Sequence, residues 1–265
     1  MVKLSNSFQI LINSAWPFII SIILFDYFLS LVSIFYNIIY SNFLFYWSSI
    51  LLIISLFWWF KEIIFEGVYK GEFSKKESYN LIIGFILFVI SEIIIFFILF
   101  FSFLYNSIIP SIDIGCLYPP LGLNIINSYS LPILNSALLY FSGLTLSISQ
   151  NYLYFRSKSY SLFYLFITII LAFIFSAIQL FEYLHSSFSI YDSIYATNFY
   201  ILTGFHGIHV IIGSSLLLMS FFKLFFNHFI MSPSNLVAFH SSAIYWAFVD
   251  YAWIAILALI YIWGS

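Results

Sequence analysis

Glu92 has the residue type and the position that most need a chemical explanation in this sequence. It lies near the middle of the apolar stretch LIIGFILFVISEIIIFFILFF, which contains no other charged residue. An ionised carboxylate at the centre of a membrane costs about 3 kcal/mol on insertion scales. Two interpretations are therefore open. Glu92 is either a protonatable group in a proton path or polar cleft, or a carboxyl group that is kept protonated or hydrogen-bonded to a neighbouring helix for packing alone.

Two further pairs of polar residues are spaced three apart, which places each pair on one face of a helix. They are Gln179 with Glu182, and His206 with His209. Paired histidines are typical of haem and metal ligands, but the chain has five His in all and offers no second pair at matching depth. We therefore predict that these four residues form an interhelical polar cluster and hold no metal. A transport site is the alternative for Gln179 and Glu182.

The composition excludes a water-soluble globular domain. Hydrophobic residues make up 63% of the 265 residues and charged residues 7%, whereas soluble domains carry about a quarter charged residues. No basic block is long enough to follow a nucleic-acid backbone. The sequence also shows no nucleophile with a paired base and no phosphate-binding glycine loop, so we expect no catalytic residue in this chain.

Apolar stretches of the length needed to cross a membrane follow one another almost end to end. A helix needs about 20 such residues to cross the hydrocarbon core. Polar, Pro and Gly residues divide the chain into spans at about 16–36, 43–60, 81–109, 132–155, 160–184, 197–226 and 237–263. The sequence therefore predicts an all-α integral membrane protein with seven transmembrane helices, whose N-terminal segment is part of the mature protein.

The basic residues predict the orientation, because Lys and Arg collect on the side of the membrane that is not crossed. With seven spans, the N-terminus and the connections after the second, fourth and sixth spans share one side. All eight basic residues fall on that side or at its helix ends: Lys3, Lys61, Lys70, Lys75, Lys76, Arg156, Lys158 and Lys223. We expect the N-terminus to face the matrix or cytoplasm.

The connections divide the chain into three parts. Residues 1–60 contain the first two spans, and residues 61–80 form a charged inner connection that extends the helices into the interface. Residues 81–265 contain the other five spans. Within them, residues 110–131 are rich in Pro and Gly, which predicts a turn-rich outer loop.

The motifs, taken in order, resemble subunit III of cytochrome c oxidase, the respiratory haem-copper oxidase. The resemblance covers nearly the whole chain. It runs through FWWFKEIIFEG at 57–67, ISE at 90–92, YPPLG at 118–122, LPILNSALLYFSG at 131–143, QLFEY at 179–183, IYDSIYATNFY at 190–200, TGFHGIHVIIG at 203–213 and YWAFVDYAWI at 245–254.

The resemblance implies a subunit without a redox centre. It also implies that the protein lies in the mitochondrial inner membrane, with a bacterial plasma membrane as the alternative. Haems and copper would be held by subunits I and II. This chain would contact mainly subunit I, besides subunit II and accessory subunits, and support proton uptake during electron transfer from cytochrome c to oxygen. It implies two helices and five helices arranged around a cleft that holds structural phospholipids.

Specific residues acquire roles through the same resemblance. Trp58, Trp59 and Glu66 match positions that contact a phospholipid, and Lys223 matches the basic residue near its headgroup. For the two Trp residues an ordinary aromatic belt is the alternative. Glu92 matches the intramembrane carboxylate that reacts with carbodiimide in some members.

Two rival functions are open at this point. The first is subunit III of a quinol-oxidising haem-copper enzyme, since the electron donor binds to another subunit. The second is an independent membrane transporter or proton channel that uses Glu92, Gln179 and Glu182. The second rival predicts flux from the purified chain alone.

Overall fold

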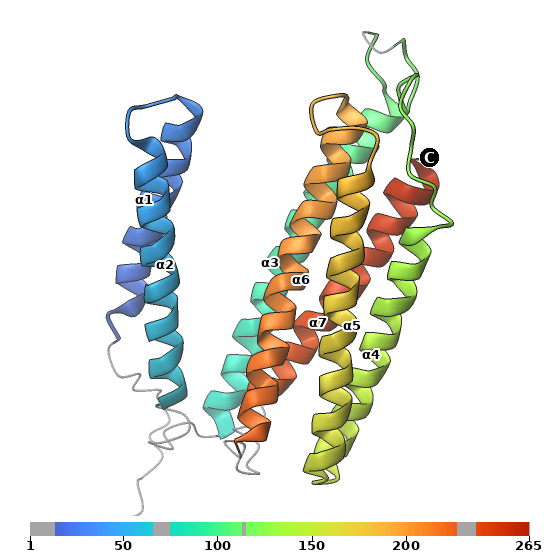
Figure 1. Ribbon diagram of the computed structural model, residues 1–265. Helices are drawn as coiled ribbons and strands as arrows, with labels where there is room; N and C mark the ends of the chain where they lie inside the picture. Colours follow the sequence, from blue (N-terminus) through green and yellow to red (C-terminus); the bar gives the residue numbers. More distant parts are fainter. Residues whose placement is uncertain (1–13, 66–74, 113–114, 227–236, 265) are drawn as a thin grey trace, which may run out of the picture. The chain divides into compact units, whose positions relative to one another are not determined.

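The computed structural model describes residues 14–65, 75–112, 115–226 and 237–264 (Figure 1). Within these residues seven helices are long and apolar enough to cross a membrane, so the predicted fold class is confirmed. The helices are α1 (Trp16–Phe35), α2 (Ser41–Ile64), α3 (Lys75–Ile108), α4 (Leu131–Tyr154), α5 (Lys158–His185), α6 (Ile194–Phe225) and α7 (Val237–Ile256), and α7 continues as π-helical turns (η3, Leu257–Trp263).

The helix ends follow local chemistry. Pro17 and Pro132 each stand in the first turn of a helix, where the missing N–H has no intrahelical partner to lose. The Ser193 side chain accepts a hydrogen bond from the Ala196 N–H at 3.0 Å and caps α6. Helix α3 starts six residues before the predicted span, in agreement with helices that extend into the charged inner connection.

The chain divides into two compact units, residues 1–78 and residues 79–265. In the first unit α1 and α2 form a hairpin. Its interhelical contact includes a 3.1 Å hydrogen bond between the hydroxyls of Ser30 and Ser48, and the rings of Tyr27 and Phe45 lie 5.2 Å apart. Small hydroxyl side chains let two membrane helices approach closely and hydrogen-bond across the interface.

In the second unit, α4 packs on α5, α5 on α6, and α6 on α7, and α7 returns to α4 (Figure 1). Helix α3 contacts this bundle through aromatic side chains. The rings of Phe96 and Phe248 of α7 lie 5.8 Å apart, and Phe85 reaches Tyr245 of α7 at 6.3 Å.

Buried residues of α4 and α5 recur at alternating spacings of three and four. On α4 they are Pro132, Asn135, Leu139, Ser142, Leu146, Ser149 and Leu153. This spacing is typical of coiled-coil seams. Hydroxyl groups close the seam, because Ser149 donates to the Ser161 carbonyl at 2.8 Å and the hydroxyls of Thr145 and Thr168 lie 2.9 Å apart.

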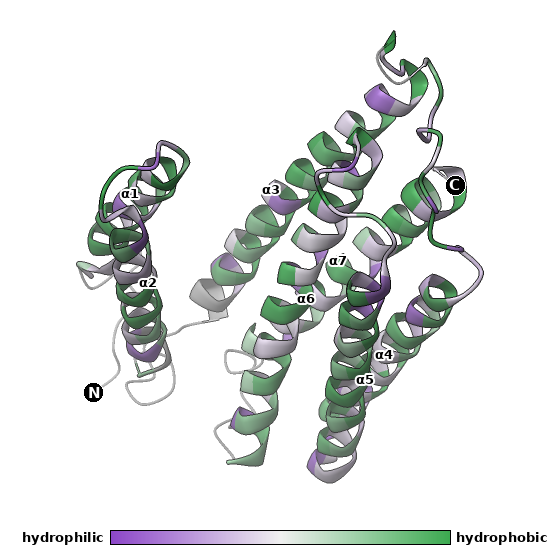
Figure 2. Cartoon of the chain, turned by 45° about the horizontal axis from the view of Figure 1, so that its top comes forward, coloured by the Kyte–Doolittle hydropathy of each residue, from purple (hydrophilic) through white to green (hydrophobic). Residues whose placement is uncertain are grey.

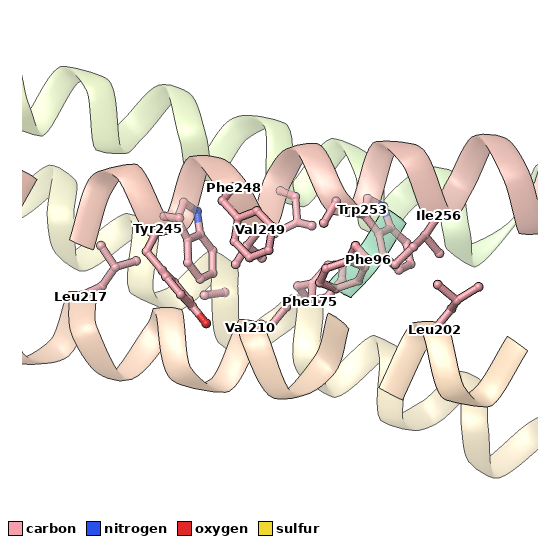
Figure 3. Close-up of a cluster of buried hydrophobic side chains, with 14 of the residues drawn as sticks. Phe96, Phe175, Leu202, Val210, Leu217, Tyr245, Phe248, Val249, Trp253 and Ile256 are labelled. Atoms are coloured by element: carbon pink, nitrogen blue, oxygen red, sulfur yellow. The ribbon is translucent and has the colours of Figure 1, made fainter. Parts of the chain in front are cut away.

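Large rings fill the interior between α5, α6 and α7 (Figure 3). Trp253 and Phe175 pack edge to face at 5.0 Å. The helices consist of hydrophobic residues over most of their length (Figure 2). Many of these residues face outward, and Phe173 on α5, for example, is 56% exposed. Apolar outer faces and a core that admits Ser, Thr and Asn are the distribution expected when lipid is the solvent.

Candidate functional site

Glu92 and His209 form the central polar contact between α3 and the rest of the second unit. Glu92 Oε2 lies 2.9 Å from Nε2 of His209 on α6, and the two side chains are 18% and 8% exposed. The other ring nitrogen, Nδ1, lies 2.6 Å from the carbonyl oxygen of Phe205, one helical turn earlier. A long-range pair thus links two spans in an otherwise apolar region.

The geometry of the His209 ring restricts the protonation of the pair. A carbonyl oxygen can only accept a hydrogen bond, so Nδ1 must carry a proton. One further proton then lies between Nε2 and Oε2, either on the carboxyl group or on the imidazole. In both cases the pair has no net charge, which removes the cost of burying an isolated ion.

Aromatic rings surround this pair. The rings of Phe96, Phe248 and Tyr245 lie 5.2, 5.6 and 6.2 Å from the imidazole ring of His209. Aromatic rings from α3 and α7 therefore flank the proton shared by Glu92 and His209. This arrangement can hold a proton, and it can also serve as a packing contact between helices.

Gln179 and Glu182 lie together in a second polar site, on α5. Tyr261 of the π-helical turns donates a 2.5 Å hydrogen bond to Glu182 Oε1, and the Asn135 amide of α4 donates to Gln179 at 3.3 Å. Helices α4 and α5 and the π-helical turns therefore meet at this site, where Asn135, Gln179 and Glu182 are buried.

The structure places the two histidines of α6 in different environments. His209 bonds to Glu92, whereas His206 is 1% exposed and neither of its ring nitrogens has a hydrogen-bond partner among the described residues. The His206 ring lies 5.3 Å from the Trp253 ring and 5.8 Å from that of Phe175. The spacing places both histidines on α6 three residues apart, but it could not indicate which neighbouring side chains their imidazole rings meet.

The residues predicted to bind lipid fall in both units. Trp58 is 47% exposed on α2, with the ammonium group of Lys61 4.4 Å from its ring centre. Trp59 stacks on Phe60 at 6.2 Å. Lys223 lies in the last turn of α6, and Glu66 lies outside the described residues.

Comparison with known proteins identifies the family. A family model described as cytochrome c oxidase subunit III matches residues 6–265. The chain belongs to this family. It is 36% identical over 260 residues to cytochrome c oxidase subunit 3 of Podospora anserina, covering 98% of this chain and 96% of the relative. The proteins of the same name from Chondrus crispus and Aedes aegypti are each 34% identical, over 98% of this chain and 95% and 98% of their own lengths.

Membership of the subunit III family confirms the resemblance found in the motifs. It also favours the cytochrome c oxidase reading over a quinol-oxidising enzyme or an independent transporter, since the relatives above carry the cytochrome c oxidase name. Membership of this family makes the chain part of a multi-subunit oxidase, and its described residues contain seven helices that are long and apolar enough to cross a membrane.

Asp250 is a site residue that the sequence analysis missed. It is the central residue of the span Val237–Trp263, and its Oδ1 atom is buried without a hydrogen-bond partner among the described residues. The signal was available, because Asp250 is a lone charge within an apolar stretch like Glu92. It lies within the motif YWAFVDYAWI at 245–254, which carries the family resemblance as a whole.

Proposed function

We propose that this chain is the non-redox subunit III of a mitochondrial cytochrome c oxidase, where it supports the subunit that binds haem and copper. The observation that carries the proposal is the family match over residues 6–265, together with relatives of the same name that cover nearly the whole chain. The complex would transfer electrons from cytochrome c to oxygen. This chain would contact mainly subunit I, with subunit II and accessory subunits as further neighbours.

Purification from the membrane in mild detergent tests this assignment. We expect the chain to co-purify with a haem-bearing subunit at a fixed ratio, identified by mass spectrometry and by the haem spectrum. A chain that purifies alone, and that carries substrate or proton flux when reconstituted into liposomes, would instead be a transporter or channel.

The proposed role does not require a redox cofactor in this chain. In support, the sequence has five His and one Cys, and among the described residues no group of three or more His, Cys, Asp and Glu side chains could hold a metal ion. His209 is also committed at both ring nitrogens. Metal analysis of the isolated chain tests this point, and stoichiometric iron or copper would contradict it.

Structural phospholipids are proposed as ligands of this chain, with Trp58, Trp59, Glu66 and Lys223 as the candidate lipid-binding residues. An indole packs well on acyl chains near the interface, and an ammonium group pairs with a phosphate as a point charge. Replacing Lys223 by Gln should remove a tightly bound phospholipid from the purified complex, as measured by lipid mass spectrometry. Arg156→Gln, in the turn between α4 and α5, is the matched control and should leave the bound lipids unchanged.

Glu92 is proposed to exchange the proton that it shares with His209. The substitution Glu92→Gln keeps the size and a hydrogen bond to Nε2 but removes proton exchange at the carboxyl group. If Glu92 supports proton uptake, the variant complex should lose turnover or inactivate sooner during turnover. Unchanged values of both quantities would leave the carboxyl group a purely structural role.

A further inference from the structure

A groove between α4 and α7 lies on the surface of the second unit. Its volume is about 530 Å³, and Gly143, Ser147, Ala243, Ala247 and Asp250 contribute to its lining. Tyr140, Tyr251 and Ile254 on its rim are 64%, 74% and 56% exposed. The groove therefore opens away from the bundle and is large enough for several side chains of another molecule.

Asp250 brings an unsatisfied carboxyl oxygen into this apolar groove. Its Oδ1 atom is buried and receives no hydrogen bond from the described residues. The Gly143 backbone leaves room for the other oxygen, because a Cβ atom at position 143 would lie 2.7 Å from Oδ2. A buried acceptor without a donor is costly, so a donor from outside the described residues would stabilise this site.

Three of the hydrogen-bond donors that line the groove are already used. The Trp246 indole N–H donates to the Ser142 hydroxyl at 2.8 Å, and the Trp253 indole N–H donates to the Ser136 hydroxyl at 2.9 Å. Ser147 donates its own hydroxyl to the carbonyl of Gly143 at 2.9 Å. The two indole bonds join α7 to α4 and the Ser147 bond lies within α4, so none of these three donors serves Asp250.

The depth of Asp250 decides between a lipid and a protein as that neighbour. Asp250 is the central residue of a 27-residue span, and at 1.5 Å per residue it lies about 20 Å along the helix from either end. A lipid headgroup stays at the interface, and an acyl chain has no hydrogen-bond donor. A transmembrane helix can place a donor at this depth.

We propose that a transmembrane helix of another subunit of the oxidase packs on the α4 and α7 groove and donates a hydrogen bond to Asp250. The donor is a hydroxyl, amide, indole or cationic side chain. The small side chains at Gly143, Ala243 and Ala247 let the two helices approach closely. The inference rests on the proposed function, since it requires a multi-subunit complex, and it adds the surface and the residue that such a partner recognises.

Carbene labelling of the intact complex tests the surface. A small apolar aryl diazirine is dissolved in nanodiscs that contain the complex, photolysed, and mapped on this chain by mass spectrometry. We expect Ala247, Tyr251 and Ile254 to be labelled several-fold less in the complex than after the chain is dissociated in stronger detergent. Phe175, which is 1% exposed, should stay unlabelled in both states and so report that the bundle remains folded.

Substitution of Asp250 tests the hydrogen bond. Asp250→Leu should lower the amount of chain retained per haem in graded detergent, by about threefold to twentyfold, the range expected for interhelical hydrogen bonds in membranes. Asp250→Asn, which keeps an acceptor oxygen, should be retained nearly as well as the wild type. Ser215→Leu, on an exposed face of α6, is the matched control and should not change retention.

The outcomes separate this inference from the proposed function. Equal labelling of the groove in the complex and in the dissociated chain would show that lipid covers the groove, and this would overturn the inference. A second copy of this chain on the groove, detected in the native mass of the complex, would also overturn it. If the Asp250→Leu chain is retained per haem as well as the wild-type chain, the proposed role of the carboxyl group is overturned. Failure of the wild-type chain to co-purify with haem would overturn the proposed function itself, and the inference with it.

Discussion

Among single residues, the bond between Glu92 and His209 should stabilise the second unit measurably. Glu92→Leu leaves the buried Nε2 atom of His209 without a partner, which should cost about 1–3 kcal/mol of stability. Glu92→Gln should cost less, because its amide N–H can donate to Nε2. The midpoint of thermal unfolding of the chain within the purified complex measures both changes.

A double-substitution cycle checks that the pair, rather than either residue alone, carries this stability. The variant with Leu at both 92 and 209 should be more stable than the sum of the two single losses predicts, since no polar atom of the pair is left unsatisfied. Additive losses would mean that the two side chains do not interact in the native complex.

Asp192, in the connection between α5 and α6, gives a prediction about pH. It accepts hydrogen bonds from the Ser189 backbone N–H at 2.6 Å and from the Ser189 hydroxyl at 2.9 Å, and these bonds lower the pKa of the Asp192 carboxyl group below its ordinary value of 3.8. The ionised form is the acceptor, so the contribution to loop stability is complete above that value and is lost as the pH falls through the lowered pKa.

Hydrogen exchange can follow this loss in the loop. The Ser189 amide should exchange more slowly than in a free peptide of residues 186–193 at pH 6, and this protection should disappear at the acidic end of the titration. In Asp192→Ala the amide should lack the protection at every pH. Equal protection of the wild type at both ends of the titration would contradict the assignment.

The residue types were easier to predict from the sequence than their partners. Glu92 could be identified because a lone carboxyl in an apolar span is costly wherever it points. Its bond to His209 joins residues 117 positions apart and depends on how α3 is rotated against α6, which no spacing within one helix reveals. The same limit applies to Tyr261, whose contact with Glu182 depends on the π-helical end of α7.

Among the helices, the close approach of α6 and α7 depends on Gly213. A Cβ atom there would lie 2.9 Å from the Trp246 ring and 3.3 Å from Tyr245. Trp246 cannot easily move, because it is fully buried and bonded to Ser142. Gly213→Ala should therefore destabilise the bundle by about 1–3 kcal/mol through overpacking, measured as a lower unfolding temperature of the chain.

Gly204 on the same helix provides the matched control. An added Cβ atom there meets nothing within 4 Å, so Gly204→Ala should be neutral within this chain or gain up to about 1 kcal/mol from helix propensity. Equal effects of the two substitutions would argue against close packing at Gly213.

Hydropathy predicted the helices well because each span must satisfy its backbone groups internally, whatever its neighbours are. The choice of neighbours was less accessible. The alternating spacing of Ser142, Leu146 and Ser149 on α4 is visible in the sequence. Hydrophobic patterning does not distinguish this seam from the outer face of the helix, where the exposed residues Phe141 and Ile148 are also apolar. The hydroxyl groups are the signal that could have located it.

For the whole molecule, the structure groups several of the basic residues that predicted the orientation. Lys158, which opens α5, donates from its ammonium group to the carbonyl of Phe225 at 2.9 Å. The turn between α4 and α5 and the end of α6 therefore meet at one end of the second unit, which brings Arg156, Lys158 and Lys223 to that end. Such a basic end should remain on the matrix side.

Cys116 allows this orientation to be tested on the natural chain. It is the single cysteine of the sequence, and it is exposed in the connection between α3 and α4, which the orientation assigns to the opposite side of the membrane. A membrane-impermeant maleimide added to sealed mitoplasts should modify Cys116 without permeabilisation. As the matched control, Phe155→Cys in a Cys116→Ser chain places an exposed thiol beside Arg156, and it should react only after the membrane is opened. The reverse order of reactivity would show that the basic end faces outward, and the electrostatic argument for the topology would then be wrong.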